Sequence, residues 1–321
     1  MPCGSERPSG WTEGCGKKRE ATAAIRFFPP YGIKKGKTVK RVFHVEQRNM
    51  DYHLHTLHSP DAEQSVDELC QTALARGVQE ICLTEHMDLG HPDPINAVPP
   101  LMDAYRQDVN DARRRYPQLT IRMGLEIGDI PQTREETRRF LQHEELDFRL
   151  LSLHVVHGTD CWNPAYYDGK TRDEAYREYV EVLAEMLDAW EDFDSVAHIG
   201  YVAKFAPYEG EKKALRYEDA PATLDHLLKR IIALDKCIEI NTSGYKATGE
   251  MFPHPSIVRR YIALGGEGFT FGSDSHDTAR DYEKIDRARD EVRAMGGKYQ
   301  ASFCKRKKSC FEIGRIAEKG V

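Results

Sequence analysis

The sequence lacks three features that would place it in a specialised class of protein. No run approaches the about 18 apolar residues of a membrane span, and the first residues lack the apolar segment of a secretory signal. The eight cysteines include no C-x-x-C pair, which argues against a zinc ribbon or a disulfide framework. We therefore expect a cytoplasmic protein with no membrane partner.

Most of the chain also lacks an excess of basic over acidic residues. Residues 50–321 carry 35 Lys and Arg against 48 Asp and Glu, which disfavours nucleic acid as a partner. Residues 1–49 carry 11 basic against 4 acidic residues. This leader fits a nucleic-acid arm, a mitochondrial-type presequence, a flexible tail, or translation upstream of the true start. We favour the last, because Met50 directly precedes a predicted strand, and expect a disordered leader at 1–49 and one domain at 50–321.

After residue 50, short β-like runs alternate with amphipathic helical patterns. Capping boxes are expected at Ser65 with Glu68 and at Thr133 with Glu136, a cap at Thr171, a stop at Gly77 and a first-turn proline at Pro255. Helices are expected over 65–77, 133–145, 171–190, 220–235 and 254–266, and strands over 78–84, 119–129, 148–154, 193–200, 237–244 and 268–276. Repeated β-then-α units imply parallel strands. The expected fold class is α/β, a TIM-like (β/α)7 barrel, with a doubly wound open sheet as the alternative.

Residues suited to binding metal gather at the ends of the predicted strands. The stretch DYHLHTLHSPD at 51–61 places His53 and His55 on one side of an extended segment. Neutral imidazole is a common metal ligand, and sites in such folds lie at the carboxyl ends of strands. The residues with this placement are His53, His55, His86, Glu126, His154, His198, Asp274 and His276. Surface, loop or supporting roles are expected for His58, His91, His143, His157, His226 and His254.

The ordered motifs HLH, LTEH, GLEIG, SLH, AHIG and GSDSH resemble those of the polymerase-and-histidinol-phosphatase (PHP) superfamily. Within it, DYHLHTLHSPD, EAYREYVEVL, AHIGYVAKF, INTSGYK and GSDSH are similar to the monofunctional histidinol-phosphatases of the HisK/HisJ type, over roughly residues 50–315. The resemblance implies a (β/α)7 barrel of the PHP type, with two or three divalent metal ions at its carboxyl-terminal mouth.

The resemblance also implies a ligand set. One ion would be held by His53, His55, Glu126 and Asp274; a second would share Glu126 and add His154 and His198; a third would use Asp61, His86 and His276. Many members of the superfamily have histidine at the position of Asp61, and the alternative role for this aspartate is to cap the next segment. Its oxygen donor favours manganese or iron over zinc, and the identity of the metal stays open.

The implied reaction is hydrolysis of the phosphate monoester of L-histidinol phosphate by a metal-bound hydroxide, giving L-histidinol and inorganic phosphate in histidine biosynthesis. Glu126 would span two ions, and Asp274 or His276 would steer a proton to the leaving group. Lys204 and Arg172 are candidates for binding phosphate, Asp160 and Asp129 for the substrate amine, and Asn241 for the mouth. The main alternative is a PHP phosphoesterase acting on nucleotide mono- or bisphosphates. A repair nuclease, an amidohydrolase and a non-catalytic metal-binding protein are disfavoured, and the oligomeric state is open.

Overall fold

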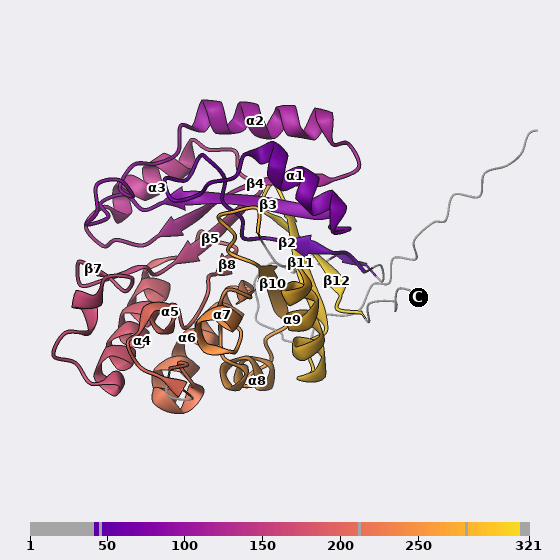
Figure 1. Ribbon diagram of the computed structural model, residues 1–321. Coiled ribbons are helices and arrows are strands. Elements are labelled where there is room, and N and C mark those ends of the chain that lie inside the picture. The colour runs from indigo at the N-terminus through magenta and orange to yellow at the C-terminus, as the bar shows by residue number, and fades with distance from the viewer. Residues whose placement is uncertain (1–41, 45–46, 211–212, 280–281, 315–321) are drawn as a thin grey trace, which may run out of the picture.

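In the computed structural model, helices alternate with strands along most of the chain (Figure 1). The structure describes residues 42–44, 47–210, 213–279 and 282–314. The strands are β1 (Val42–His44), β2 (Met50–Asp51), β3 (Glu80–Met87), β4 (Thr120–Gly128), β5 (Phe148–Ser152), β6 (Val155–Val156), β7 (Thr159–Asp160), β8 (Ser195–Val196), β9 (Cys237–Asn241), β10 (Gly268–Gly272), β11 (Tyr299–Cys304) and β12 (Lys307–Glu312). The α-helices are α1 (Val66–Ala75), α2 (Met102–Arg115), α3 (Arg134–Gln142), α4 (Arg172–Ala189), α5 (Val202–Phe205), α6 (Pro221–Ala233), α7 (Gly244–Thr248), α8 (Pro255–Ala263) and α9 (Glu283–Ala294), with short 3-10 turns at η1 (Pro164–Tyr167) and η3 (Tyr217–Asp219).

The central sheet is mostly parallel, so the fold is of the mixed α/β class. Its order is β1-β12-β11-β10-β9-β8-β5-β4-β3-β2, and the only antiparallel pair within this described sheet joins β11 to β12. The residues after β2 also bond to the end of β10: the amide of Tyr52 donates to the carbonyl of Phe271 at 2.8 Å, and that of Asp274 to the carbonyl of His53 at 2.9 Å. The residues that follow β2 therefore lie beside the end of β10, the strand at the other end of the series of parallel strands from β2 to β10.

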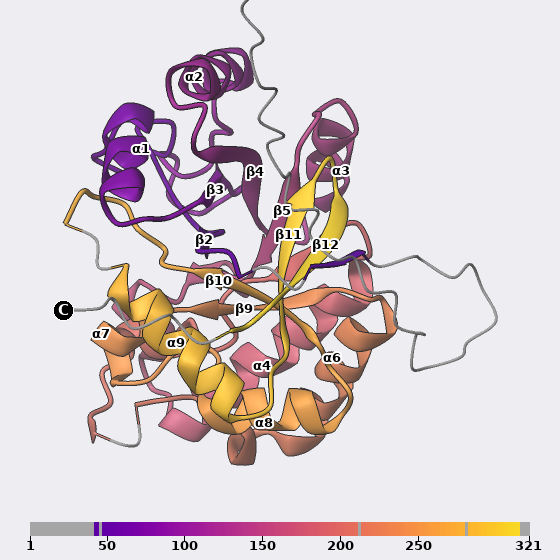
Figure 2. The ribbon, with the colours of Figure 1, turned by 90° about the vertical axis from the view of Figure 1, so that its right-hand side faces the viewer.

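The helices surround the strands (Figures 1 and 2), with α1, α2 and α3 on one side and α4, α6 and α8 on the other. The longest, α4, shows how the sequence determines this arrangement. Tyr176, Tyr179, Leu183 and Leu187 recur at helical spacing and are all buried. Burying a side chain of this size contributes about 1.5–3 kcal/mol, so this stripe holds α4 against its neighbours.

Most of the predicted helix signals are confirmed. The reciprocal capping boxes of Ser65 and of Thr171 are both formed, Gly77 has φ +73° after α1, and Pro255 is the first residue of α8. The predicted box at Thr133 is wrong, because its hydroxyl bonds to the carbonyls of Leu89 and Ile130 instead of capping α3. Helices α2 and α9 were not predicted from the sequence.

The described part of the predicted leader includes β1, which pairs in parallel with β12 through Val42 and Ser309. The boundary at residue 49 stays a prediction, and the remainder of the leader lies outside the described residues. Among the helices that the structure describes, none combines the length and the apolar character that a bilayer crossing requires.

Candidate metal centre

Eight of the nine predicted ligands lie on or just after six strands and converge at one edge of the sheet, and Asp61 lies in the longer loop after β2. Glu126 lies on β4 and is in register with His86 on β3 and Leu150 on β5. His154 and His198 lie in the loops just after β5 and β8, where the carboxyl ends of parallel strands meet. His198 and Asp274 both have left-handed backbone, with φ of 37° and 56°. Such conformations are costly away from glycine and tend to occur at functional sites.

The carboxylate of Glu126 lies at the centre of the cluster. Its Oε2 is 3.1 Å from Nε2 of His53, 3.4 Å from Nε2 of His55 and 3.1 Å from Nδ1 of His86. Its Oε1 is 2.8 Å from Nε2 of His198 and 3.2 Å from Nε2 of His154. The two oxygens therefore face two different groups of histidines.

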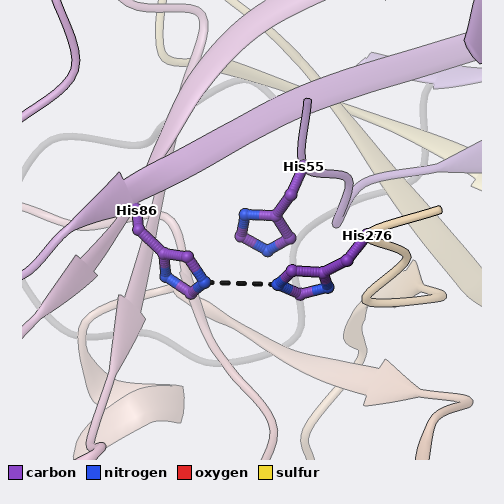
Figure 3. Close-up of side chains that lie close together, drawn as sticks. All are labelled: His55, His86 and His276. Carbon is purple, nitrogen blue, oxygen red and sulfur yellow. Dashed lines mark hydrogen bonds between the residues drawn. The ribbon is translucent and has the colours of Figure 1, made fainter. Parts of the chain in front are cut away.

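The remaining predicted ligands lie beside the first group. Figure 3 shows His55, His86 and His276 together, with Nε2 of His86 3.4 Å from Nε2 of His276. Oδ2 of Asp61 is 3.5 Å from the first of these nitrogens and 3.3 Å from the second. Oδ1 of Asp274 lies 3.6 Å from Nε2 of His53 and 3.8 Å from Nε2 of His55. The structure thus brings all nine predicted ligands into one cluster.

Several of these atoms are buried without a hydrogen bond. They are Nε2 of His53, Nε2 of His55, Nδ1 of His86 and Oε2 of Glu126. A buried polar atom without a partner is costly, yet these four point toward one another. Nitrogen and carboxylate oxygen donors within this reach suit divalent cations, so the residues fit the ions that the resemblance implies.

The electrostatics keep the acids ionised. Burial favours the protonated carboxyl, but the surrounding His53, His154 and His86 hold the pKa of Glu126 well below its usual range. Burial likewise opposes ionisation of Asp274, whose pKa is lowered by Lys204 and then by His53. Burial, followed by the neighbouring histidines, lowers the pKa of His55. Burial opposes protonation of His53, but Glu126 and then Glu239 raise its pKa. An ion would therefore displace a proton there, because the neutral imidazole is the form that binds a metal.

The cluster opens into a cleft with a volume of about 530 Å³. Lys204 lines this cleft, and its Nζ is 2.7 Å from Oδ2 of Asp274. Arg172 does not line it; its guanidinium bonds to Asp219 at 2.7 and 2.8 Å and to the carbonyl of Ala214. The position of Lys204 supports the predicted phosphate contact, whereas the position of Arg172 does not.

Of the two candidates for binding the substrate amine, only one lines the cleft. Asp160 lines the cleft, where it accepts from Nε2 of His91 at 2.9 Å and from the amide of Trp162 at 2.7 Å. Asp129 is buried against Arg134 and Trp190 and does not line the cleft. The buried Asn241 does not line it either.

Two carboxylates beside the cluster were not predicted from the sequence. Asp88 lies 2.8 Å from Nδ1 of His154, and Glu239 lies 2.6 Å from Nδ1 of His53. Asp88 directly follows β3, two residues after His86 and on the same side of the extended chain. This spacing could have indicated it. Glu239 lies within β9, before its end, where no strand-end signal applies.

Comparison with known proteins gives a consistent result. The family described as PHP domain matches residues 51–243. A histidinol-phosphatase from Lactococcus lactis is 28% identical over 258 residues, which cover 80% of this chain and 94% of that protein. A protein from Clostridium acetobutylicum named "Probable histidinol-phosphatase" is 31% identical over 227 residues, covering 70% of this chain and 86% of that protein.

A solved structure gives the same relationship at the level of the fold. The histidinol phosphate phosphatase of Lactococcus lactis, in complex with zinc, L-histidinol and phosphate, superposes with a TM-score of 0.75 at 27% identity. The match covers 82% of this chain and 99% of that one. A structure from Listeria monocytogenes, with a TM-score of 0.63 at 22% identity over 72% of this chain and 96% of that one, supports the fold alone.

Proposed function

Because this chain belongs to the PHP domain family, we propose that it hydrolyses the phosphate monoester of L-histidinol phosphate to L-histidinol and inorganic phosphate. The observation that carries the proposal is the convergence of nine ligand-type side chains in one cluster, seven of which line a cleft, in a chain related to histidinol-phosphatases. The reaction is a step of histidine biosynthesis, and the protein is accordingly a phosphoric monoester hydrolase.

The proposed ligands follow the geometry of Glu126. One ion would be held by His53, His55, Glu126 and Asp274, a second by Glu126, His154 and His198, and a third by Asp61, His86 and His276. Bound divalent cations would supply an activated water and neutralise charge on phosphoryl oxygens. Zinc in the Lactococcus structure makes zinc one candidate here, together with manganese and iron.

The residues of the chain would organise the substrate around this centre. Lys204 lines the cleft beside Asp274 and would give the ester phosphate a cationic contact. Asp274 is fixed by Lys204 and by the hydroxyl of Ser243 at 3.2 Å. Asp274 and His276 both line the cleft, where either would hold or deliver the proton that the leaving alkoxide needs.

The rim of the cleft suits the organic part of this substrate. Asp160 supplies a carboxylate for the amine, and Trp162, which is 59% exposed, offers a ring face to the imidazole. Phe205, 40% exposed, lines the same cleft. A nucleotide would bring no amine of this kind, so we favour the amino alcohol phosphate over the nucleotide alternative.

We further propose that seven strands close into the (β/α)7 barrel of the PHP type, namely β2, β3, β4, β5, β8, β9 and β10. The support is the set of backbone bonds between residues 52–55 and 271–275, including the amide of His55 and the carbonyl of Ser275 at 3.0 Å. The scattered cysteines suit the reducing cytoplasm, which we propose as the location of the protein.

The test is phosphate release from histidinol phosphate and from a panel of nucleotide monophosphates and bisphosphates. The protein is stripped with a chelator and then supplied with zinc, manganese or iron. We expect metal-dependent turnover with a kcat/KM for histidinol phosphate well above that for any nucleotide. Equal or faster hydrolysis of a nucleotide would replace the proposed substrate with the alternative.

A further inference from the structure

Two motif glycines have neighbours that explain why no side chain is present there. A Cβ on Gly128, at the end of GLEIG, would overlap the carboxylate of Asp88. A Cβ on Gly272, at the start of GSDSH, would overlap both the carboxylate of Glu239 and the Cβ of His53. Neither glycine is among those with positive φ. The space at these positions, rather than a special backbone conformation, is therefore what glycine provides.

Each of the two carboxylates occupies that space to contact a predicted ligand histidine. Oε1 of Glu239 is 2.6 Å from Nδ1 of His53, and Oδ1 of Asp88 is 2.8 Å from Nδ1 of His154. Glu239 is 1% exposed and Asp88 is 3% exposed. Buried and close, each carboxylate accepts a strong hydrogen bond from its imidazole.

This bond determines what the other side of each ring presents. When Nδ1 carries the proton and donates it, Nε2 keeps its lone pair. Nε2 of His53 then points at Oε2 of Glu126 at 3.1 Å, and Nε2 of His154 at Oε1 of the same residue at 3.2 Å. Both rings are thus oriented with Nε2, the nitrogen that would bind an ion, toward the centre of the cluster.

We propose that Glu239 and Asp88 are positioning residues that fix the orientation and tautomer of His53 and His154, and that Gly272 and Gly128 are small so as to admit them. The proposal rests on the metal centre of the proposed function and adds four residues to it. Carboxylates behind ligating histidines raise the basicity of the ligand and reduce the freedom that binding must remove.

Glu239 also contacts a second predicted ligand and a buried amide. Its Oε2 accepts from the backbone amide of His198 at 2.9 Å and from Nδ2 of Asn241 at 3.1 Å. His198 is on the opposite oxygen of Glu126 from His53. Loss of Glu239 should therefore disturb ligands in two of the proposed ion sites. Loss of Asp88 should act through His154 and through His86, whose Nδ1 is 3.6 Å from its Oδ2.

The experiment measures metal binding without substrate. Metal-free full-length protein is titrated with Co²⁺ against a chromophoric chelator, and the visible absorption of the bound ion is recorded. The variants are Glu239→Ala, Glu239→Gln and Gly272→Ala. Asp188→Asn is the matched control, since Asp188 also pairs with a histidine, His226 at 3.0 Å, but both side chains are more than half exposed.

We expect Glu239→Ala and Gly272→Ala to weaken Co²⁺ binding about 10- to 100-fold and to change the absorption spectrum. Glu239→Gln should lose less, because the amide oxygen still accepts from Nδ1, and Asp188→Asn should match the wild type. Thermal unfolding of the metal-free proteins identifies any variant that fails to fold. If Glu239→Ala does not fold, Glu239→Gln is compared with the wild type instead.

Wild-type Co²⁺ affinity and spectrum in folded Glu239→Ala and Glu239→Gln would overturn the inference. This outcome is distinct from failure of the proposed function, which would appear as a wild-type protein that binds the metal normally but does not hydrolyse histidinol phosphate. A wild-type protein that binds no Co²⁺ would overturn both.

Discussion

At the scale of single residues, the two oxygens of Glu126 have different neighbours. Oε2 faces His53, His55 and His86, whereas Oε1 faces His154 and His198. A carboxylate with ligands on both sides can bridge two ions and set their separation. Asp61 has a more peripheral position, with a side chain that is 50% exposed.

This difference predicts unequal effects of two conservative substitutions. Glu126→Gln should weaken two ions together and lower kcat by more than Asp61→Asn, because the amide cannot neutralise cations on both sides. Metal content by elemental analysis and kcat on the same samples provide the measurement. If Glu126→Gln kept its metals and a near-normal rate, the shared role of this glutamate would be wrong.

Substitution can likewise distinguish the roles of the two candidate phosphate-binding cations. Lys204→Met should lower kcat/KM about 10- to 100-fold, the effect of one charge-assisted hydrogen bond of about 1.5–3 kcal/mol. Arg172→Gln should leave kcat/KM close to that of the wild type and lower the melting temperature, because it breaks the pair with Asp219. Steady-state kinetics with thermal unfolding of both variants make the comparison; the reverse pattern would assign phosphate binding to Arg172.

Sequence alone could predict much of this site but not its supporting contacts. His53 and His55 were predicted because two imidazoles at alternate positions of an extended segment face the same side, and parallel strands end at one edge. Glu239 gives no such signal, since its position beside His53 arises from the pairing of distant strands. In the sequence, Arg172 and Lys204 are equally plausible cations for phosphate. Only the structure shows that Arg172, at the start of α4, pairs with Asp219 instead of lining the cleft.

At the scale of helices and strands, capping residues predicted where two of the helices begin. The boxes at Ser65 and Thr171 formed because each precedes an amphipathic helix. The box predicted at Thr133 failed because a tertiary partner, the carbonyl of Leu89, competes for its hydroxyl. The start of α2 has no side-chain cap at Leu101, so this helix lacks the capping signal that marked α1 and α4.

The first turn of α8 predicts a pH effect on stability. Nδ1 of His254 accepts from the amide of Ser256 at 3.1 Å, and burial, followed by the charge of Arg216, lowers the pKa of His254 to about 4. An unfolded histidine titrates near 6.5, so the unfolded state binds more protons between these values. This contribution is therefore fully present above about pH 6.5 and is lost as the pH falls toward 4.

The full shift corresponds to ~3 kcal/mol, which partial exposure of the ring reduces to about 1 kcal/mol. Urea unfolding at pH 7 and pH 5 measures the loss in the wild type and in His254→Asn, which keeps a good capping residue but does not titrate. The wild type should lose more stability than the variant over this interval. Equal losses would show that His254 does not contribute to the pH dependence.

At the scale of the whole molecule, the cluster links elements from most of the length of the chain. His53 follows β2, Glu126 lies on β4, His198 follows β8, and Asp274 and His276 follow β10. Ions bound here would stabilise the arrangement of the entire sheet, because they bind the folded state alone. The sequence predicted the parallel strands but not the order in which β11, β12 and β1 extend the sheet, since pairing between distant segments leaves no local periodic signal.

Removal of metal should therefore lower global stability as well as activity. At a metal concentration of about 100 times Kd, binding contributes ~2.7 kcal/mol, so treatment with a chelator should lower the melting temperature by about 5–10 °C. Differential scanning calorimetry before chelation, after chelation and after adding back zinc or manganese measures the effect. An unchanged melting temperature in protein shown to have lost its ions would mean that the centre does not couple to folding.

The distribution of the ligands along the chain also determines when the centre can form during synthesis. A ribosome would release His53 and His55 long before Asp274 and His276 emerge from its exit tunnel. Until then, the nascent chain carries an incomplete set of imidazoles and carboxylates that can hold an ion only loosely. Loading with a cation would thus be a late event in the maturation of the protein, after nearly the whole sheet has been translated.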